Sequence, residues 1–300
     1  MRALLAAAAL AAVTARQQVP VFRGGVDLVN VGAVVTDKRG NLVTNLLRDD
    51  FEVWEDGRKQ TITHFARGDD DPATQPELHL GLMLDVSESM SEDLAFTKTA
   101  AVKFLNTLTD ARDVTVVDFD TEVRAARYSQ AEFARLIERI RSKKVGGFTA
   151  IYDAVALYLD GAGGQDGRKI MLLYTDGGDT RSTLSFGQLI DLLKASDVTA
   201  YVIGMLEHQS SLSKNAQRTV IMQIAETTGG QALFPTSAKQ LDEIYDKVVS
   251  QIRAQYTLGY TSTNSRTDGR WRKVEIKVRK DDRGLRVRSR KGYFAAYKPA

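Results

Sequence analysis

Oxygen-bearing side chains follow apolar runs at separated places in the chain. One group comes directly after the mostly apolar stretch 79–84, another follows the run 170–174, and a third lies between them in a Gly-Gly-Phe-Thr-Ala segment. Carboxylates and hydroxyls without a nitrogen or sulfur ligand suit a hard divalent cation, most naturally Mg²⁺, with Mn²⁺ or Ca²⁺ as alternatives. The sequence therefore predicts a metal site made of five residues: Asp85, Ser87, Ser89, Thr149 and Asp176.

The position of these residues favours binding over bond-breaking. Short apolar runs predict buried strands of a parallel sheet, and ligands of such sheets bind outside the carboxyl ends of the strands. In an extended segment alternate residues project the same way, so Asp85, Ser87 and Ser89 can present three oxygens to one point. So few protein oxygens leave coordination positions open to water or to an external ligand.

Strands and helices alternate from residue 78 onward, which is typical of a doubly wound, mostly parallel α/β sheet. We assign residues 78–253 to this domain. The expected strands are 79–84, 114–119, 170–174, 200–203 and 232–234, and the expected helices are 94–108, 132–140, 150–159, 186–194, 215–226 and 239–253.

The flanking segments have the alternation of half-buried strands. Residues 26–66 contain an Asp-Gly hairpin signal at 56–57, and residues 254–295 are again all strand. Neither segment has enough strands to be stable alone, so we expect one small β-sandwich divided by the inserted α/β domain. Residues 67–77 are polar and contain proline, which is typical of a linker.

Composition excludes several other classes. The 300 residues carry a formal charge of +3 and no cysteine, which excludes disulfides, thiol catalysis and cysteine-rich zinc sites. Basic residues are concentrated in 266–298, but there they alternate with Val274, Ile276 and Val278. We interpret them as the solvated face of a strand, with no nucleic-acid partner.

The first residues predict export. A single arginine precedes an alanine-rich apolar run, and small residues end it, so residues 1–15 are expected to be a secretory signal peptide. The run is too short to span a membrane, and no later stretch is long enough. We expect a periplasmic, cell-surface or secreted bacterial protein.

The same residues carry a family resemblance. The Asp-x-Ser-x-Ser motif at Asp85, the later Thr149 and the Thr-Asp-Gly-Gly segment at Asp176 resemble the metal-ion-dependent adhesion site of von Willebrand factor type A domains. Phe148 stands where many members pass directly from glycine to threonine. Residues 50–57 and 256–260 also resemble exported bacterial proteins described as VWFA-related (acidobacterial type).

The resemblance implies specific roles. Ser87 and Ser89 would ligate the metal directly, and Thr149 would do so in the ligand-bound state. Asp85 and Asp176 would act mostly through water. An incoming carboxylate would pull the metal toward Thr149 and shift the helix 239–253. The implied function is an exported, non-enzymatic module that captures an Asp or Glu of a protein partner through Mg²⁺.

Three alternatives remain open at this point. Ser87 and Ser89 could cap the following helix, since residues 89–92 also match a capping box. The chain could be a secreted hydrolase whose metal activates water, for which Ser87 or Ser89 would need a neighbouring histidine. The metal could also serve the fold alone.

Overall fold

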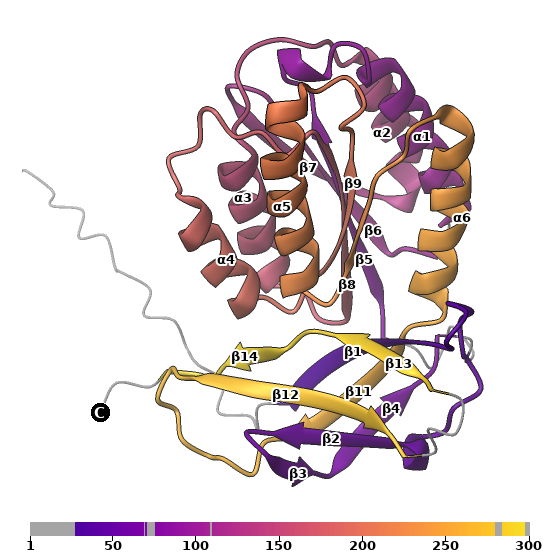
Figure 1. Cartoon of the computed structure of the whole chain (residues 1–300), viewed down its shortest axis with the longest axis vertical. Helices are drawn as coiled ribbons and strands as arrows, with labels where there is room; N and C mark the ends of the chain where they lie inside the picture. Colours follow the sequence, from indigo (N-terminus) through magenta and orange to yellow (C-terminus); the bar gives the residue numbers. More distant parts are fainter. Residues whose placement is uncertain (1–27, 69, 71–75, 109, 280–283, 298–300) are drawn as a thin grey trace, which may run out of the picture.

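The polypeptide folds into two stacked parts, an α/β unit and a smaller β-sandwich (Figure 1). The computed structural model describes residues 28–68, 70, 76–108, 110–279 and 284–297. The predicted signal peptide and most of the predicted linker lie outside these residues.

The α/β unit contains one six-stranded sheet in the order β10-β9-β8-β5-β6-β7. All neighbours are parallel except β7, which runs antiparallel to β6 at the edge. The predicted fold class is therefore confirmed. The strands are β5 (Leu78–Asp85), β6 (Asp113–Phe119), β7 (Val123–Ser129), β8 (Arg168–Thr175), β9 (Thr199–Gly204) and β10 (Gln231–Leu233).

Helices cover both faces of this sheet (Figure 1). Alternate residues of the central strand β5 supply the two cores: Leu82 and Leu84 pack on one face and Met83 on the other. The first face is covered by α1 (Leu94–Thr107), α2 (Phe133–Ser142) and α6 (Ala238–Arg253), and the second by α3 (Ile151–Gly163), α4 (Phe186–Ala195) and α5 (Ser211–Thr227). The sequence predicted each of these helices to within a few residues.

One close approach fixes the distance between α3 and the sheet. A Cβ atom added to Gly81 of β5 would lie 2.3 Å from the ring of Tyr158 on α3. Tyr158 is itself buried, so it has little room to move. We therefore expect Gly81→Ala to cost about 1–3 kcal/mol through overpacking.

The β-sandwich has two four-stranded sheets, ordered β13-β1-β11-β4 and β14-β12-β2-β3. Val31 of β1 faces Leu258 of β11 in one sheet, and Val53 of β2 faces Ile276 of β12 in the other; all four belong to one buried cluster. The strands are β1 (Leu28–Thr36), β2 (Phe51–Glu55), β3 (Arg58–Gln60), β4 (Ile62–Ala66), β11 (Tyr256–Thr261), β12 (Trp271–Val278), β13 (Arg286–Ser289) and β14 (Gly292–Phe294).

The chain leaves the sandwich and returns to it at adjacent positions. Ala66, at the end of β4, pairs with Thr257 near the start of β11, and the whole α/β unit lies between them in sequence. Segments far apart in the sequence thus complete each sheet. This agrees with the predicted sandwich of N- and C-terminal segments, because insertion requires the two ends of the inserted unit to be close.

Local predictions for the sandwich were mostly right. The Asp56-Gly57 pair forms the β2–β3 hairpin, and both residues have positive φ (46° and 79°), as a type I′ turn requires. The solvated-face interpretation of the basic stretch is wrong for Arg272, whose side chain is 5% exposed and is 2.7 Å from Asp268. Arg272 shares the buried face of β12 with Val274.

Three short 3-10 helices in the described residues each precede a strand or an α-helix: Arg48–Asp50, Glu88–Met90 and Gln130–Glu132. None of the helices in the described parts of the chain combines the length and apolarity that a membrane span requires.

Candidate functional site

The Asp-x-Ser-x-Ser motif lies at the carboxyl end of β5. Asp85, the last residue of the strand, is fully buried. Its Oδ1 accepts hydrogen bonds from the Ser87 main-chain N–H at 3.0 Å and from the Ser87 hydroxyl at 2.6 Å. Ser87 Oγ in turn lies 3.1 Å from Ser89 Oγ. The structure therefore brings the three motif side chains together.

A turn, and not an extended segment, brings these side chains together. Glu88–Met90 form a short 3-10 helix with Ser87 at its N-cap position, so the extended geometry expected for residues 85–89 is wrong. The capping alternative is also wrong, because the Ser87 side chain makes no cap hydrogen bond to this 3-10 helix and the N-cap of α1 is Asp93. Instead, the Ser87 hydroxyl donates to Asp85 and lies next to the Ser89 hydroxyl.

Asp176 joins this cluster from the end of β8. It is 1% exposed, and its Oδ1 accepts a hydrogen bond from the Gly178 N–H at 2.8 Å. Its Oδ2 accepts a hydrogen bond from Gln209 Nε2 at 3.0 Å, and the neighbouring Ser89 hydroxyl also favours the ionised carboxylate. Ser87 thus links Asp85 to Ser89, and Asp176 lies close enough to Asp85 for the two charges to repel.

Thr149 reaches the site through main-chain contacts. Its N–H donates to Thr180 Oγ1 at 3.0 Å, and its carbonyl accepts the N–H of Thr180 at 2.9 Å, which ties it to the loop after Asp176. On the other side, Gly146 N donates to Val86 O at 3.0 Å. Residue 149 is thus held between the loops that follow β5 and β8, and it is 5% exposed.

Both carboxylates of the site are held in an environment that disfavours their charge. Burial, followed by repulsion from Asp176, raises the pKa of Asp85 to about 7. Burial also raises the pKa of Asp176, and the nearby charge of Asp93 adds to the effect. The hydrogen-bond donors described above are all neutral hydroxyl, amide or main-chain groups, so they lower these pKa values only in part and carry no positive charge to balance the carboxylates.

This donor set fits a hard divalent cation. The described residues hold no group of three or more histidine, aspartate or glutamate side chains placed to bind a metal. The cluster offers two carboxylates with neighbouring hydroxyls, which are the oxygen donors that Mg²⁺ uses while keeping several waters. A cation there would also offset the charge of two buried carboxylates.

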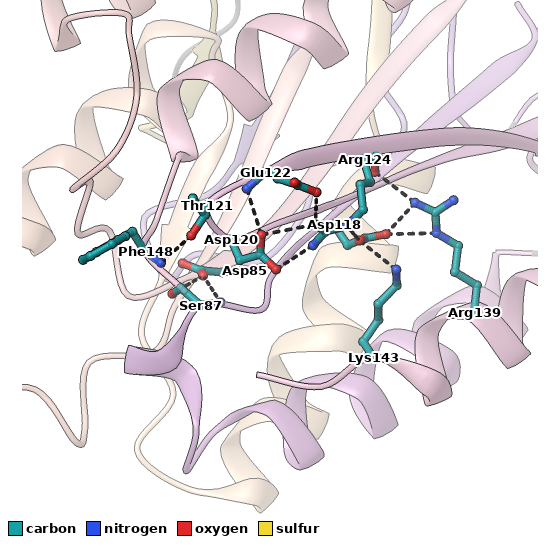
Figure 2. Close-up of polar contacts among 10 residues, drawn as sticks. All are labelled: Asp85, Ser87, Asp118, Asp120, Thr121, Glu122, Arg124, Arg139, Lys143 and Phe148. Atoms are coloured by element: carbon teal, nitrogen blue, oxygen red, sulfur yellow. Dashed lines mark hydrogen bonds and ion pairs between the residues drawn. The ribbon is translucent and has the colours of Figure 1, made fainter. Parts of the chain in front are cut away.

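A second buried carboxylate nearby has the opposite environment (Figure 2). Asp118 of β6 is fully buried, and its oxygens accept hydrogen bonds from Arg124 Nε at 2.8 Å, Arg139 Nε at 2.9 Å and Lys143 Nζ at 2.8 Å. Burial alone would raise the pKa of Asp118, but these three cationic donors outweigh it and hold the pKa below its ordinary value.

The Asp118 cluster supports the loop that carries Thr149 (Figure 2). Arg124 also bonds to Asp120 Oδ2 at 2.7 Å, which fixes the turn between β6 and β7. That turn holds the loop at two points: Phe148 N donates to Thr121 Oγ1 at 2.9 Å, and Ala150 N donates to the Asp120 carbonyl at 3.0 Å.

Sequence reasoning missed several of these supporting residues. Thr175 donates to Asp85 Oδ2 at 2.7 Å, and its place directly before Asp176 was the available signal. For Asp118 the signal was a carboxylate within an otherwise apolar strand. Gln209 and Thr121 lie in polar loops and give no sequence signal.

The histidines occupy other positions. His79 lies at the opposite edge of the sheet, where it contacts Asp113 at 3.1 Å and the Asp166 carbonyl at 2.8 Å. His208 follows β9 at the same edge as the site, but its ring nitrogens lie 3.2 Å from Asp93 and 3.3 Å from Glu92. Neither ring contacts a serine of the motif in these interactions.

Comparison with solved structures identifies the fold. A von Willebrand factor type A protein from Catenulispora acidiphila is 13% identical with a TM-score of 0.51, covering 92% of this chain and 76% of that one. The PilB minor pilin from Streptococcus sanguinis is 14% identical with a TM-score of 0.51, covering 62% of this chain. The match spans 63% of the pilin's own length.

These likenesses establish the fold alone. No protein-family model matches the chain, and no curated protein does. The α/β unit has the fold of von Willebrand factor type A domains, as the sequence resemblance implied.

Proposed function

We propose that this chain is an exported, non-enzymatic binding module that holds Mg²⁺ at the carboxyl edge of its sheet and captures an acidic group of a protein partner. The observation that carries the proposal is the cluster of Asp85, Ser87, Ser89 and Asp176, whose two buried carboxylates repel each other and have neutral hydrogen-bond partners. Mn²⁺ or Ca²⁺ could occupy the same oxygens.

Each residue has a specific role in this proposal. Ser87, Ser89 and Thr149 hold the metal, and Asp85 and Asp176 hold its waters and balance its charge. The bound metal supplies a positive centre with an open coordination position for a carboxylate oxygen. The protein supplies the preorganised geometry: Thr175 and Gln209 fix the two carboxylates, and the turn after β6 fixes the Thr149 loop.

The descriptions of two similar structures support a binding role for this chain over a catalytic one. One similar structure is a minor pilin and another is a von Willebrand factor type A protein, and both descriptions are consistent with an interaction module. The contacts of His79 and His208 with other groups provide no base for Ser87 or Ser89, which makes the hydrolase alternative less attractive.

Calorimetric titration tests the proposal. We expect Mg²⁺ and Mn²⁺ to bind the wild type, and Asp85→Ala and Ser87→Ala to abolish binding while the protein stays folded. Asp49→Ala is the matched control, because Asp49 is an exposed aspartate of the sandwich with an 85% exposed side chain. Unchanged metal affinity in the two site variants would overturn the site. Partner capture that survives chelation would remove the metal's proposed role.

A further inference from the structure

Two large apolar side chains stand exposed on either side of the candidate metal site. Phe148, next to Thr149, is 64% exposed, and Leu212, three residues after Gln209, is 93% exposed. Single exposed apolar residues are common and need no explanation. These two are distinctive because each belongs to a segment bonded to the site.

The backbone of Phe148 is fixed on several sides. Its own N–H donates to Thr121 Oγ1, the Gly147 carbonyl accepts the Glu88 N–H at 3.2 Å, and Thr149 is tied to Thr180. The ring extends away from Asp85 and Ser87 (Figure 2). An exposed aromatic ring on a fixed loop loses little conformational freedom when a partner covers it.

Leu212 is fixed on the opposite side. It is the second residue of α5, whose first turn is capped by the Ser210 hydroxyl accepting from Ser213 N at 3.3 Å. The preceding Gln209 bonds to Asp176, so the start of α5 is attached to the site itself. Leu212 therefore lies on the β9 side and Phe148 on the β6 side.

The strand order gives the spacing between the two sides. In the strand order β9-β8-β5-β6, the β9 side and the β6 side are separated by three inter-strand spacings, or about 14 Å. The metal site, at the ends of β5 and β8, lies between these two sides. In an extended peptide, residues four apart project to the same side and are separated by about 13 Å, with a residue midway between them also on that side.

We propose, resting on the function above, that the site recognises an extended protein segment in which one Asp or Glu binds the metal and large apolar residues two positions before and after it contact Phe148 and Leu212. A lone carboxylate cannot distinguish partners, because any carboxylate can fill the open position of the metal. The two apolar contacts supply that selectivity.

Fluorescence anisotropy with labelled peptides tests this inference. In Mg²⁺, a peptide containing Leu-Ser-Asp-Ser-Phe should bind the full chain about tenfold or more tightly than the same peptide with serine at both apolar positions. A peptide with Leu and Phe moved next to the Asp should bind as weakly as the serine peptide. Equal affinity for the three peptides, or no binding of the first, overturns the proposal.

Variants separate this inference from the proposed function. Phe148→Ser and Leu212→Ser should each remove the preference for the apolar peptide without changing calorimetric Mg²⁺ affinity. Leu47→Ser, at a 62% exposed leucine of the sandwich, should leave the preference intact. A preference that persists in the first two variants overturns the inference. A preference that persists in chelator overturns the metal's role and leaves the apolar contacts standing.

Discussion

Asp118 and Asp85 are both fully buried carboxylates at the carboxyl ends of adjacent strands. Asp118 pairs in register with Leu84, the residue before Asp85. Three cationic side chains surround Asp118 and lower its pKa, whereas hydroxyls and an N–H surround Asp85 and its pKa rises to about 7. Neither side chain is exposed to solvent, and the three cations beside Asp118 account for its lowered pKa.

Asp118 belongs to an ion cluster whose cations are supplied by the protein, whereas Asp85 belongs to a site suited to an added cation. The charges at Asp118 are balanced by Arg124, Arg139 and Lys143, and the cluster serves to fix the turn that supports the Thr149 loop. The charges at Asp85 and Asp176 are not balanced by the bonded groups described. Removing each carboxylate should therefore have opposite effects on stability.

The largest expected effect is that of Asp118→Ala. Removing this carboxylate leaves three cations partly buried without their shared partner, which should lower the free energy of unfolding by about 3–5 kcal/mol. Urea denaturation measures it. Asp49→Ala, which breaks an exposed pair with Arg48, is the control and should change stability by less than about 0.5 kcal/mol. A loss at Asp118 no larger than the control's would contradict the cluster's structural role.

Asp85→Asn should act in the other direction. Without metal the variant should be at least as stable as the wild type, because it removes a buried negative charge. At a Mg²⁺ concentration one hundred times the dissociation constant, the wild type should gain about 2.7 kcal/mol and the variant nothing. Thermal denaturation with and without Mg²⁺ measures both. Equal stabilisation of the two proteins would show that the metal binds elsewhere.

The raised pKa of Asp85 predicts how stability depends on pH. Between the unfolded value of 3.8 and about 7, the folded state keeps a proton on Asp85 that the unfolded state has lost. The metal-free protein should therefore lose stability as pH rises from 5 to 8, by about 2–3 kcal/mol from this group.

Asp176 and His208 contribute with the same sign, because burial raises the pKa of Asp176 and the hydrogen bond with Asp93 raises the pKa of His208 in the folded protein. Asp85→Asn therefore serves as the control, since it removes the Asp85 part of the slope and leaves Asp176 and His208 in place. Denaturant unfolding of the wild type and Asp85→Asn, in chelator at several pH values, measures how the free energy of unfolding depends on pH. A slope that is identical in wild type and variant would refute the assignment to Asp85.

The smallest expected effect concerns the connection between the two clusters. Thr121→Val keeps the side-chain shape but removes the acceptor of the Phe148 N–H, which should cost about 1 kcal/mol and weaken Mg²⁺ binding about fivefold. Thr99→Val is the control, because the Thr99 hydroxyl bonds only within the exposed side of α1. Calorimetry measures the Mg²⁺ affinity of Thr121→Val and Thr99→Val. Equal affinity in the two variants would mean that the turn between β6 and β7 does not position the Thr149 loop.

Much of the fold could be predicted because apolar patterning reflects burial directly. The runs at β5 and β8 and the helical faces of α4 and α6 gave their positions within a few residues. The strand β7 was missed because this edge strand reads Val-Arg-Ala-Ala-Arg-Tyr-Ser and has only partly buried or exposed residues. Arg272 was misplaced because its charge was taken to require solvent, although two-residue alternation puts it on the same face as Val274; its pairing with Asp268 permits the burial.

The sequence alone determined the types and order of the oxygen donors and their positions after apolar strands, because strand ends in parallel sheets meet at one edge. Tertiary structure decided which groups surround each carboxylate. Arg139 and Lys143 come from α2 and its following residue to reach Asp118, while Thr175 comes from β8 to reach Asp85. Charge balance depends on neighbours brought together by folding, and chain order does not specify them.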